Sequence, residues 1–205
     1  MGRSRERRPS LASRIQARLA ALYGVDAPSV DAFIRKSNGG REVLEVHEHA
    51  DGIELALYLP KRAFSSAPPP TLDVVCQVVE GVSHFVYVFE RARREVPITQ
   101  LELELQAEVD KFVLLGLTAR RDDGTIDLGR ARSLRDRLYE RVRFVHPEGT
   151  EPGDRYRLAN RLAAQFATAL VGRLGDDASS KRTTRELRRF FEAGLREKLE
   201  IARAA

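Results

Sequence analysis

The residues best placed to do chemistry are a glutamate and a histidine four positions apart, Glu80 and His84. They fall in a stretch, at about residues 72–96, whose polar residues recur with the period of an α-helix. A carboxylate and an imidazole at this spacing could act as an acid–base pair or share a metal ion. A metal needs at least one further ligand, and the sequence lacks the helical signatures that supply it. Glu80 and His84 are therefore the candidate catalytic residues of an enzyme.

The same two residues belong to a longer polar stripe on this predicted helix. A helix with one apolar side needs a polar side toward water whatever its function, so we interpret the stripe as a solvated face and keep a site there as the alternative. The opposite side is rich in valine and phenylalanine, and Gly81 there would let a neighbouring element approach closely. We predict that this helix lies at the centre of the core. The polar stripe consists of Asp73, Gln77, Glu80, His84 and Arg91.

Two histidines, His47 and His49, are the candidate metal ligands. They lie in a predicted β-hairpin at about 42–60, whose turn we place at Asp51-Gly52, so that His49 pairs with Glu54. Imidazoles and carboxylates on one sheet face could bind zinc. A solvated face with cross-strand histidine–glutamate pairs explains the same residues. We therefore assign no metal and no other cofactor.

Clusters of arginine on the C-terminal helices could follow a phosphate backbone. The candidate nucleic-acid contacts are Arg185, Arg188 and Arg189, together with a basic arm at residues 1–10. Acidic residues such as Glu186 interrupt the cluster, and helix faces of mixed sign are usually solvated. The solvated interpretation is the one we adopt, with nucleic-acid binding as the alternative.

The end of the fourth predicted helix, Leu115-Gly116-Leu117, and the hairpin predicted at about 117–128 resemble the recognition helix and wing of a winged helix-turn-helix module. The resemblance implies a DNA-reading helix, yet this helix is acidic and would repel phosphate. Contact with a protein suits it better. Its acidic residues are Glu102, Glu104, Glu108 and Asp110.

These candidates are positioned by a fold that we predict to be α+β and mainly α, a helical domain carrying the hairpin at about 42–60 and a second small hairpin at about 117–128. We expect a flexible basic arm at 1–10, a helical core with the hairpin at 11–146, and a C-terminal helical pair at 147–205 packed on the same domain. Thr99 and Glu102 form a capping box, which predicts a helix start at Thr99. The predicted helices cover about 11–23, 30–37, 72–96, 99–115, 128–144, 155–173 and the chain from residue 183.

Composition limits the functional classes further. The single cysteine, Cys76, excludes an internal disulfide and fits a reducing compartment. No secretory signal and no run of about 18 apolar residues is visible, so we expect a cytoplasmic protein that contacts no membrane. The net charge of +5 is divided between basic ends and an acidic middle. Phosphate loops, dinucleotide-binding glycine motifs and the nucleophile elbow are absent from the sequence.

Together these features favour a non-enzymatic intracellular interaction or regulatory protein, with another protein as its partner. A nucleic-acid-associated factor that uses the basic arm and the C-terminal helices is the first alternative. An enzyme with its site on the polar stripe is the second. The oligomeric state is open.

Overall fold

The computed structural model describes every residue except 1–8, 51, 66, 117–126, 177–179 and 205. Its fold is α+β and mainly α, which confirms the predicted class, with 65% of the residues helical. The second hairpin predicted at about 117–128 falls almost entirely outside the described residues, and Leu128 begins a helix. Most of the predicted basic arm also lies outside them.

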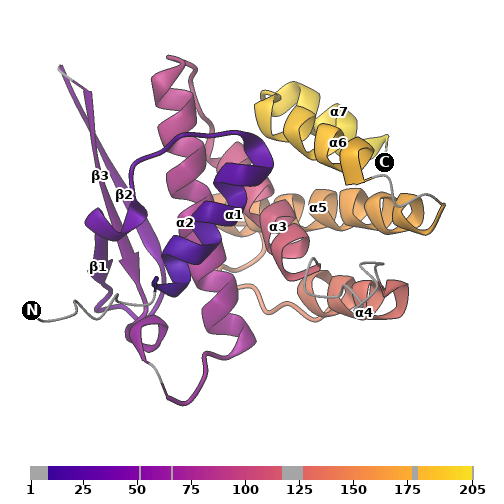
Figure 1. Ribbon diagram of the computed structural model, residues 1–205, viewed down its shortest axis with the longest axis horizontal. Coiled ribbons are helices and arrows are strands. Elements are labelled where there is room, and N and C mark those ends of the chain that lie inside the picture. Colours follow the sequence, from indigo (N-terminus) through magenta and orange to yellow (C-terminus); the bar gives the residue numbers. More distant parts are fainter. Residues whose placement is uncertain (1–8, 51, 66, 117–126, 177–179, 205) are drawn as a thin grey trace, which may run out of the picture.

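A small mixed sheet forms one side of the molecule (Figure 1). Its strand order is β1-β3-β2, with β1 parallel to β3 and β2 antiparallel to it. The predicted hairpin is present as β2 and β3. The prediction of a short helix at about 30–37 is wrong, because this segment forms a 3₁₀ turn at Val30–Ala32 followed by strand β1. The strands are β1 (Ile34–Lys36), β2 (Val43–His49) and β3 (Gly52–Leu59).

The hairpin register differs by two residues from the predicted one. His49 pairs with Gly52, and His47 rather than His49 pairs with Glu54. Gly52 has a φ of 142°, a conformation open to glycine, which lets it take the first position of β3 instead of the turn. A shift of two residues keeps every side chain on its face, so Leu44 still shares an apolar face with Leu57.

Helix α2 (Leu72–Arg93) is the predicted long helix and lies at the centre of the core, between the sheet and the helices that follow α2 in the chain (Figure 1). Thr71 caps it by accepting a hydrogen bond from the Val74 N–H. A Cβ at Gly81 would lie 2.6 Å from Leu57 Cδ1, so the glycine permits the close approach of β3. By length and composition α2 could also cross a membrane, but 72% of its most apolar stretch is buried inside the protein.

Helix α3 (Gln100–Gly116) packs against α2 and begins at the predicted capping box. The Glu102 N–H donates to Thr99 Oγ1 at 3.2 Å, and the Thr99 N–H donates to Glu102 Oε2 at 2.9 Å. The packing of α3 on α2 corrects the prediction that the polar stripe of α2 is a solvated face. The stripe does not face water, because Gln77, Glu80, His84 and Arg91 are buried and only Asp73 is exposed.

Helices α3 to α7 lie on the side of α2 away from the sheet, whereas α1 runs across α2 and begins beside the sheet (Figure 1). Helix α5 packs against α3, α4 and α7, and α1 packs against α2 and α6. The last predicted helix is two helices, because the chain breaks at Gly194 and restarts. The bounds are α1 (Leu11–Tyr23), α4 (Leu128–Tyr139), α5 (Glu151–Asp176), α6 (Ser180–Glu192) and α7 (Leu195–Arg203).

Candidate functional site

A buried ion pair joins α2 to α3 at the middle of the polar stripe. Lys111 Nζ lies 2.7 Å from Glu80 Oε2 and 2.8 Å from Glu108 Oε1. Glu104 and Glu42 bring two more carboxyl groups to the same place, from α3 and from the residue before β2. Four carboxyl groups therefore surround one ammonium group. We call Glu42, Glu80, Glu104, Glu108 and Lys111 the acidic cluster.

The acidic cluster holds protons at neutral pH. Burial raises the pKa of Glu42 to about 9, and the charge of Glu80 adds to the effect. Burial likewise raises the pKa of Glu104 to about 8, again with a contribution from Glu80. Burial would raise the pKa of Glu80 too, but the Lys111 ammonium group outweighs it and lowers that pKa. Glu80 is thus the ionised partner of Lys111, while Glu42 and Glu104 stay protonated.

His84 lies one turn beyond Glu80 on α2, as the sequence predicts, and is only 9% exposed. Its Nε2 atom has no hydrogen-bond partner among the described residues. Burial lowers the pKa of His84, so the ring is neutral, while the charge of Glu80 opposes this shift. A buried polar atom without a partner is destabilising in most proteins and is uncommon.

Two other buried polar atoms without a partner among the described residues are on α5. They are Arg155 Nε and Asn160 Oδ1. Between them on the helix is Tyr156, whose hydroxyl group is hydrogen-bonded to Glu104. Tyr156 also stacks against His146, with the ring planes 4° apart.

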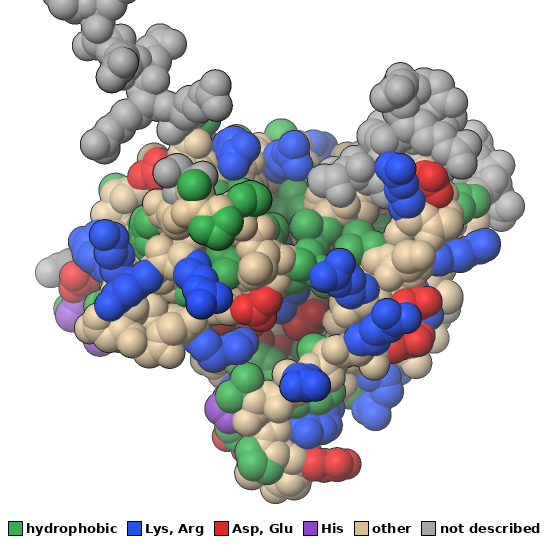
Figure 2. All heavy atoms as spheres, turned by 90° about the horizontal axis from the view of Figure 1, so that it is seen from below, with side chains coloured by type: hydrophobic (Ala, Val, Ile, Leu, Met, Phe, Trp, Pro, Cys, Tyr) green, Lys and Arg blue, Asp and Glu red, His purple; other side chains and the backbone are tan. Residues whose placement is uncertain are grey.

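A cavity of about 320 Å³ opens onto the acidic cluster. Glu42, Glu80, Glu108 and Lys111 line it, whereas His84 and Glu104 are not among its lining residues. Figure 2 shows one face of the molecule hollowed near its middle, with acidic side chains in the depth of the hollow and lysine and arginine side chains around it. The other lining residues are Arg41, Val43, Val142, Arg143, Phe144, Val145, His146 and Tyr156.

A second buried polar group uses different positions in the same stretches of α2 and α3, and it is matched internally. Asp110 accepts hydrogen bonds from Tyr23 Oη, from Ser83 Oγ at 2.5 Å and from Gln106 Nε2 at 3.0 Å. Lys198 Nζ donates to Gln106 Oε1 at 2.6 Å and to the Phe190 carbonyl at 2.6 Å. We call Tyr23, Ser83, Gln106, Asp110 and Lys198 the closed network.

Arg91, the last member of the polar stripe, binds within the protein as well. Its Nη2 atom donates to Glu102 Oε1 at 2.8 Å and to the Ala193 carbonyl at 3.0 Å. This buried pair links α2 to the start of α3 and to the connection between α6 and α7. It ties the C-terminal helices to the core and leaves the arginine no freedom to bind a ligand.

His47 and His49 lie on the exposed hairpin. His47 Nε2 is 4.0 Å from Glu45 Oε2, and His49 Nε2 is 3.7 Å from Glu54 Oε2. Both imidazoles are largely in solvent. Across the described part of the chain, no group of three or more histidine, cysteine, aspartate or glutamate side chains is arranged to hold a metal ion.

Two of the three candidate nucleic-acid contacts are engaged within the protein. Arg188 Nε donates to the Leu22 carbonyl at 2.6 Å, at the end of α1, and Arg189 Nη2 lies 3.1 Å from Glu197 Oε1. Arg185 lines a surface hollow together with Arg188 and Arg189. The structure therefore gives Arg188 a role in holding α1 against α6.

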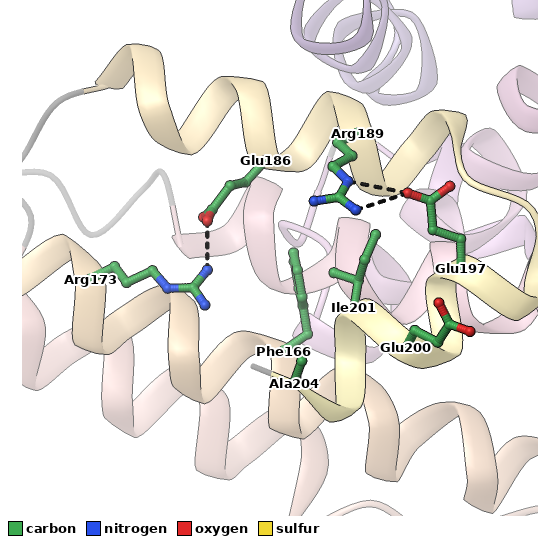
Figure 3. A pocket seen from close by; sticks show the side chains of 8 residues that line it. All are labelled: Phe166, Arg173, Glu186, Arg189, Glu197, Glu200, Ile201 and Ala204. Atoms are coloured by element: carbon green, nitrogen blue, oxygen red, sulfur yellow. Dashed lines mark hydrogen bonds and ion pairs between the residues drawn. The ribbon is translucent and has the colours of Figure 1, made fainter.

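A second cavity, of about 290 Å³, lies between α5, α6 and α7. Figure 3 shows its charged side chains pointing toward one another: Arg173 Nη1 lies 2.8 Å from Glu186 Oε1, and Arg189 pairs with Glu197. Glu200, also in its wall, pairs with Arg196. Because these charges are paired with one another, this cavity offers a ligand fewer free charged groups than the cavity at the acidic cluster does.

Sequence reasoning found Glu80 but missed its partners. Glu104, Glu108 and Lys111 recur at spacings of four and three, which places them on one face of α3. This charged face of α3 is the signal that could have identified them, because two helices with buried charged faces can pair those faces, and α2 has the polar stripe. Tyr156 and Glu42 carry no such signal. Comparison with known proteins found no matching family model, no matching curated protein and no matching solved structure.

Proposed function

We propose that the chain is a non-enzymatic regulatory protein that binds a small organic cation, an ammonium group with an apolar body, in the cavity at the acidic cluster. The observation that carries the proposal is the imbalance of charge in the cavity floor. Three carboxyl groups, Glu42, Glu80 and Glu108, line it with one buried ammonium group, whereas the other two basic side chains of the lining, Arg41 and Arg143, are exposed to water. Glu104, which does not line the cavity, adds a fourth carboxyl group to the cluster. Lys111 matches only part of this set.

The imbalance favours exchange of protons for a cation. Glu42 has a pKa of about 9 and carries a proton at neutral pH because its charge would be buried beside Glu80. A ligand ammonium group in the cavity would favour the ionised carboxylate and release this proton. The protein thus offers the ligand a full negative charge at short range in a partly buried site.

The walls of the cavity support an apolar body on the ligand. Val43, Val142 and Val145 are exposed apolar residues at its rim, and Phe144 lies beside them. The volume is at the lower end of the range for small-molecule pockets, roughly 300–1,000 Å³. An alkyl or aryl amine suits both the rim and the floor.

Binding is favoured over catalysis because only one of the two candidate catalytic residues lines the cavity. Glu80 lines it, whereas His84 is buried and is not among the lining residues. An acid–base pair needs both groups within hydrogen-bond reach of the reacting atoms. The nucleic-acid alternative is disfavoured because Arg188 and Arg189 already bind groups of the protein.

Isothermal titration calorimetry of the full chain tests the proposal with three probes of equal length: n-hexylamine, n-hexanol and hexanoate. We expect the amine to bind at least about tenfold more tightly than the other two. Titrations at pH 7 in buffers of different ionisation enthalpy should show release of about one proton per amine bound.

Variants locate the site. Glu42→Gln should weaken amine binding about tenfold or more and abolish proton release, because the amide cannot ionise. Glu48→Gln, on the exposed strand β2, should bind as the unmodified chain does. Equal affinity for hexylamine and hexanol, or unchanged binding by Glu42→Gln, would overturn the proposal.

A further inference from the structure

We propose that two copies of this chain pair through strand β2, antiparallel and centred on Val46, so that two three-stranded sheets join into one of six strands. Strand β2 is the edge of the sheet, because the strand order is β1-β3-β2. The backbone groups on its outer side have no strand beside them among the described residues. Such an edge is a template for another strand.

The outer half of the hairpin has little support from the rest of the protein. Strand β1 pairs only with residues 57–59 of β3. The residues 45–49 of β2 and 52–54 of β3 are exposed. Figure 1 shows this end of the hairpin extending away from α2. A two-stranded hairpin alone is marginally stable in water, so added strands would stabilise it.

The three central side chains of β2 are complementary to those of a second copy in one register. With Val46 on the twofold axis, Glu45 of each copy lies opposite His47 of the other, and the two Val46 side chains face each other. A register centred on Glu45 would place two carboxylates together, and one centred on His47 would place two imidazoles together. This self-complementarity is why we assign a second copy, instead of a different protein, to the edge.

The apolar face of the hairpin agrees with this arrangement. Val46 is 40% exposed and Ile53, on the same face, is 38% exposed. Pairing about Val46 would bring the two Val46 side chains into contact and partly cover that face. The proposal is independent of the cavity, whose ligand could bind to a monomer.

Cysteine crosslinking of the full chain tests the register. In a Cys76→Ala background, Val46→Cys places two thiols directly opposite across the axis, within the range that a disulfide spans. We expect oxidation to give a covalent dimer at micromolar protein. Ile53→Cys, equally exposed but one strand farther from the axis, should crosslink much less. Equal crosslinking of both variants would overturn the register.

Sedimentation equilibrium of variants without cysteine changes tests the pairing itself. Val46→Lys should raise the dimer Kd at least about tenfold, because two ammonium groups would meet on the axis, whereas Ile53→Lys should leave it nearly unchanged. Glu45→Lys should weaken the dimer, and adding His47→Glu should restore it by reversing the charge pair. If the unmodified chain stays monomeric at about 100 μM, roughly 100-fold above the concentration used for crosslinking, the proposal is overturned.

Discussion

The interface between α2 and α3 buries two groups of polar side chains that differ in how well their charges are matched. In the closed network Asp110 accepts three hydrogen bonds, and Lys198, which is fully buried, donates two. In the acidic cluster four carboxyl groups share one ammonium group, and a cavity opens beside them. Of the three buried polar atoms without partners in the described chain, one is on His84, one turn from Glu80 on α2, and two are on α5.

Burial of charge alone therefore does not distinguish a site from a structural contact. Burial raises the pKa of Asp110 to about 6 and lowers the pKa of Lys198 well below its usual value, yet both groups are bonded within the protein. The acidic cluster differs because its four carboxyl groups share one ammonium group and because a cavity opens onto it. Matched networks fix a structure, whereas an unmatched one can change its protonation when a ligand enters.

The largest effect should come from breaking a matched pair in the core. Arg91→Met would leave Glu102 buried without its cation and the Ala193 carbonyl without its donor. We expect a loss of about 3–5 kcal/mol in the free energy of unfolding, measured by urea denaturation.

The matched control for this change is another arginine–glutamate pair. Arg196→Met removes the partner of Glu200, but that pair is exposed and should contribute at most about 0.5 kcal/mol. If Arg91→Met were no more destabilising than Arg196→Met, the buried pair would not hold the C-terminal helices to the core.

A smaller effect, of opposite sign, should come from the acidic cluster. The pKa of Glu104 is about 8 in the folded chain, so the folded state holds a proton that the unfolded state loses above pH 4.5. Stability from this group is present at low pH and falls as the pH rises toward 8. Glu104→Gln keeps the shape without the charge, and should be nearly neutral at pH 5 but stabilising by roughly 3 kcal/mol at pH 9.

The measurement is the difference in the free energy of unfolding between Glu104→Gln and the unmodified chain as a function of pH, because the contributions of other titrating groups cancel in this difference. Urea denaturation at pH 5, 7 and 9 gives it directly. A Glu104→Gln variant with equal stability relative to the unmodified chain at pH 5 and pH 9 would mean that Glu104 is ionised throughout, and the cluster would then resemble the closed network.

The sequence predicted the elements better than their partners. Helical periodicity located α2, and the Thr99–Glu102 capping box located the start of α3, because both signals are local. Burial of the polar stripe could not be read in this way. The partner of Glu80 is Lys111, thirty-one positions later, and only the packing of α3 on α2 brings the two together.

The same reasoning explains the missed hairpin register and the missed strand. Asp51-Gly52 is a strong turn signal, but registers that differ by two residues place the same side chains on the same faces, so the pattern could not choose between them. Strand β1 has three residues, too few for a periodic signal, and is defined by its pairing with β3.

The smallest effect separates the two regions most directly. His84 and Gln106 are both buried polar residues between α2 and α3, but His84 Nε2 lacks a partner while Gln106 bonds Asp110 and Lys198. His84→Leu removes an unsatisfied Nε2 atom at similar volume, together with a hydrogen bond to the Leu103 backbone, and should change the free energy of unfolding by less than about 1 kcal/mol. Gln106→Met, its counterpart in the closed network, leaves two buried groups with fewer partners and should lose about 2 kcal/mol. A loss for His84→Leu as large as that for Gln106→Met would show that Nε2 is bonded in solution, and would make the cluster a structural contact like its neighbour.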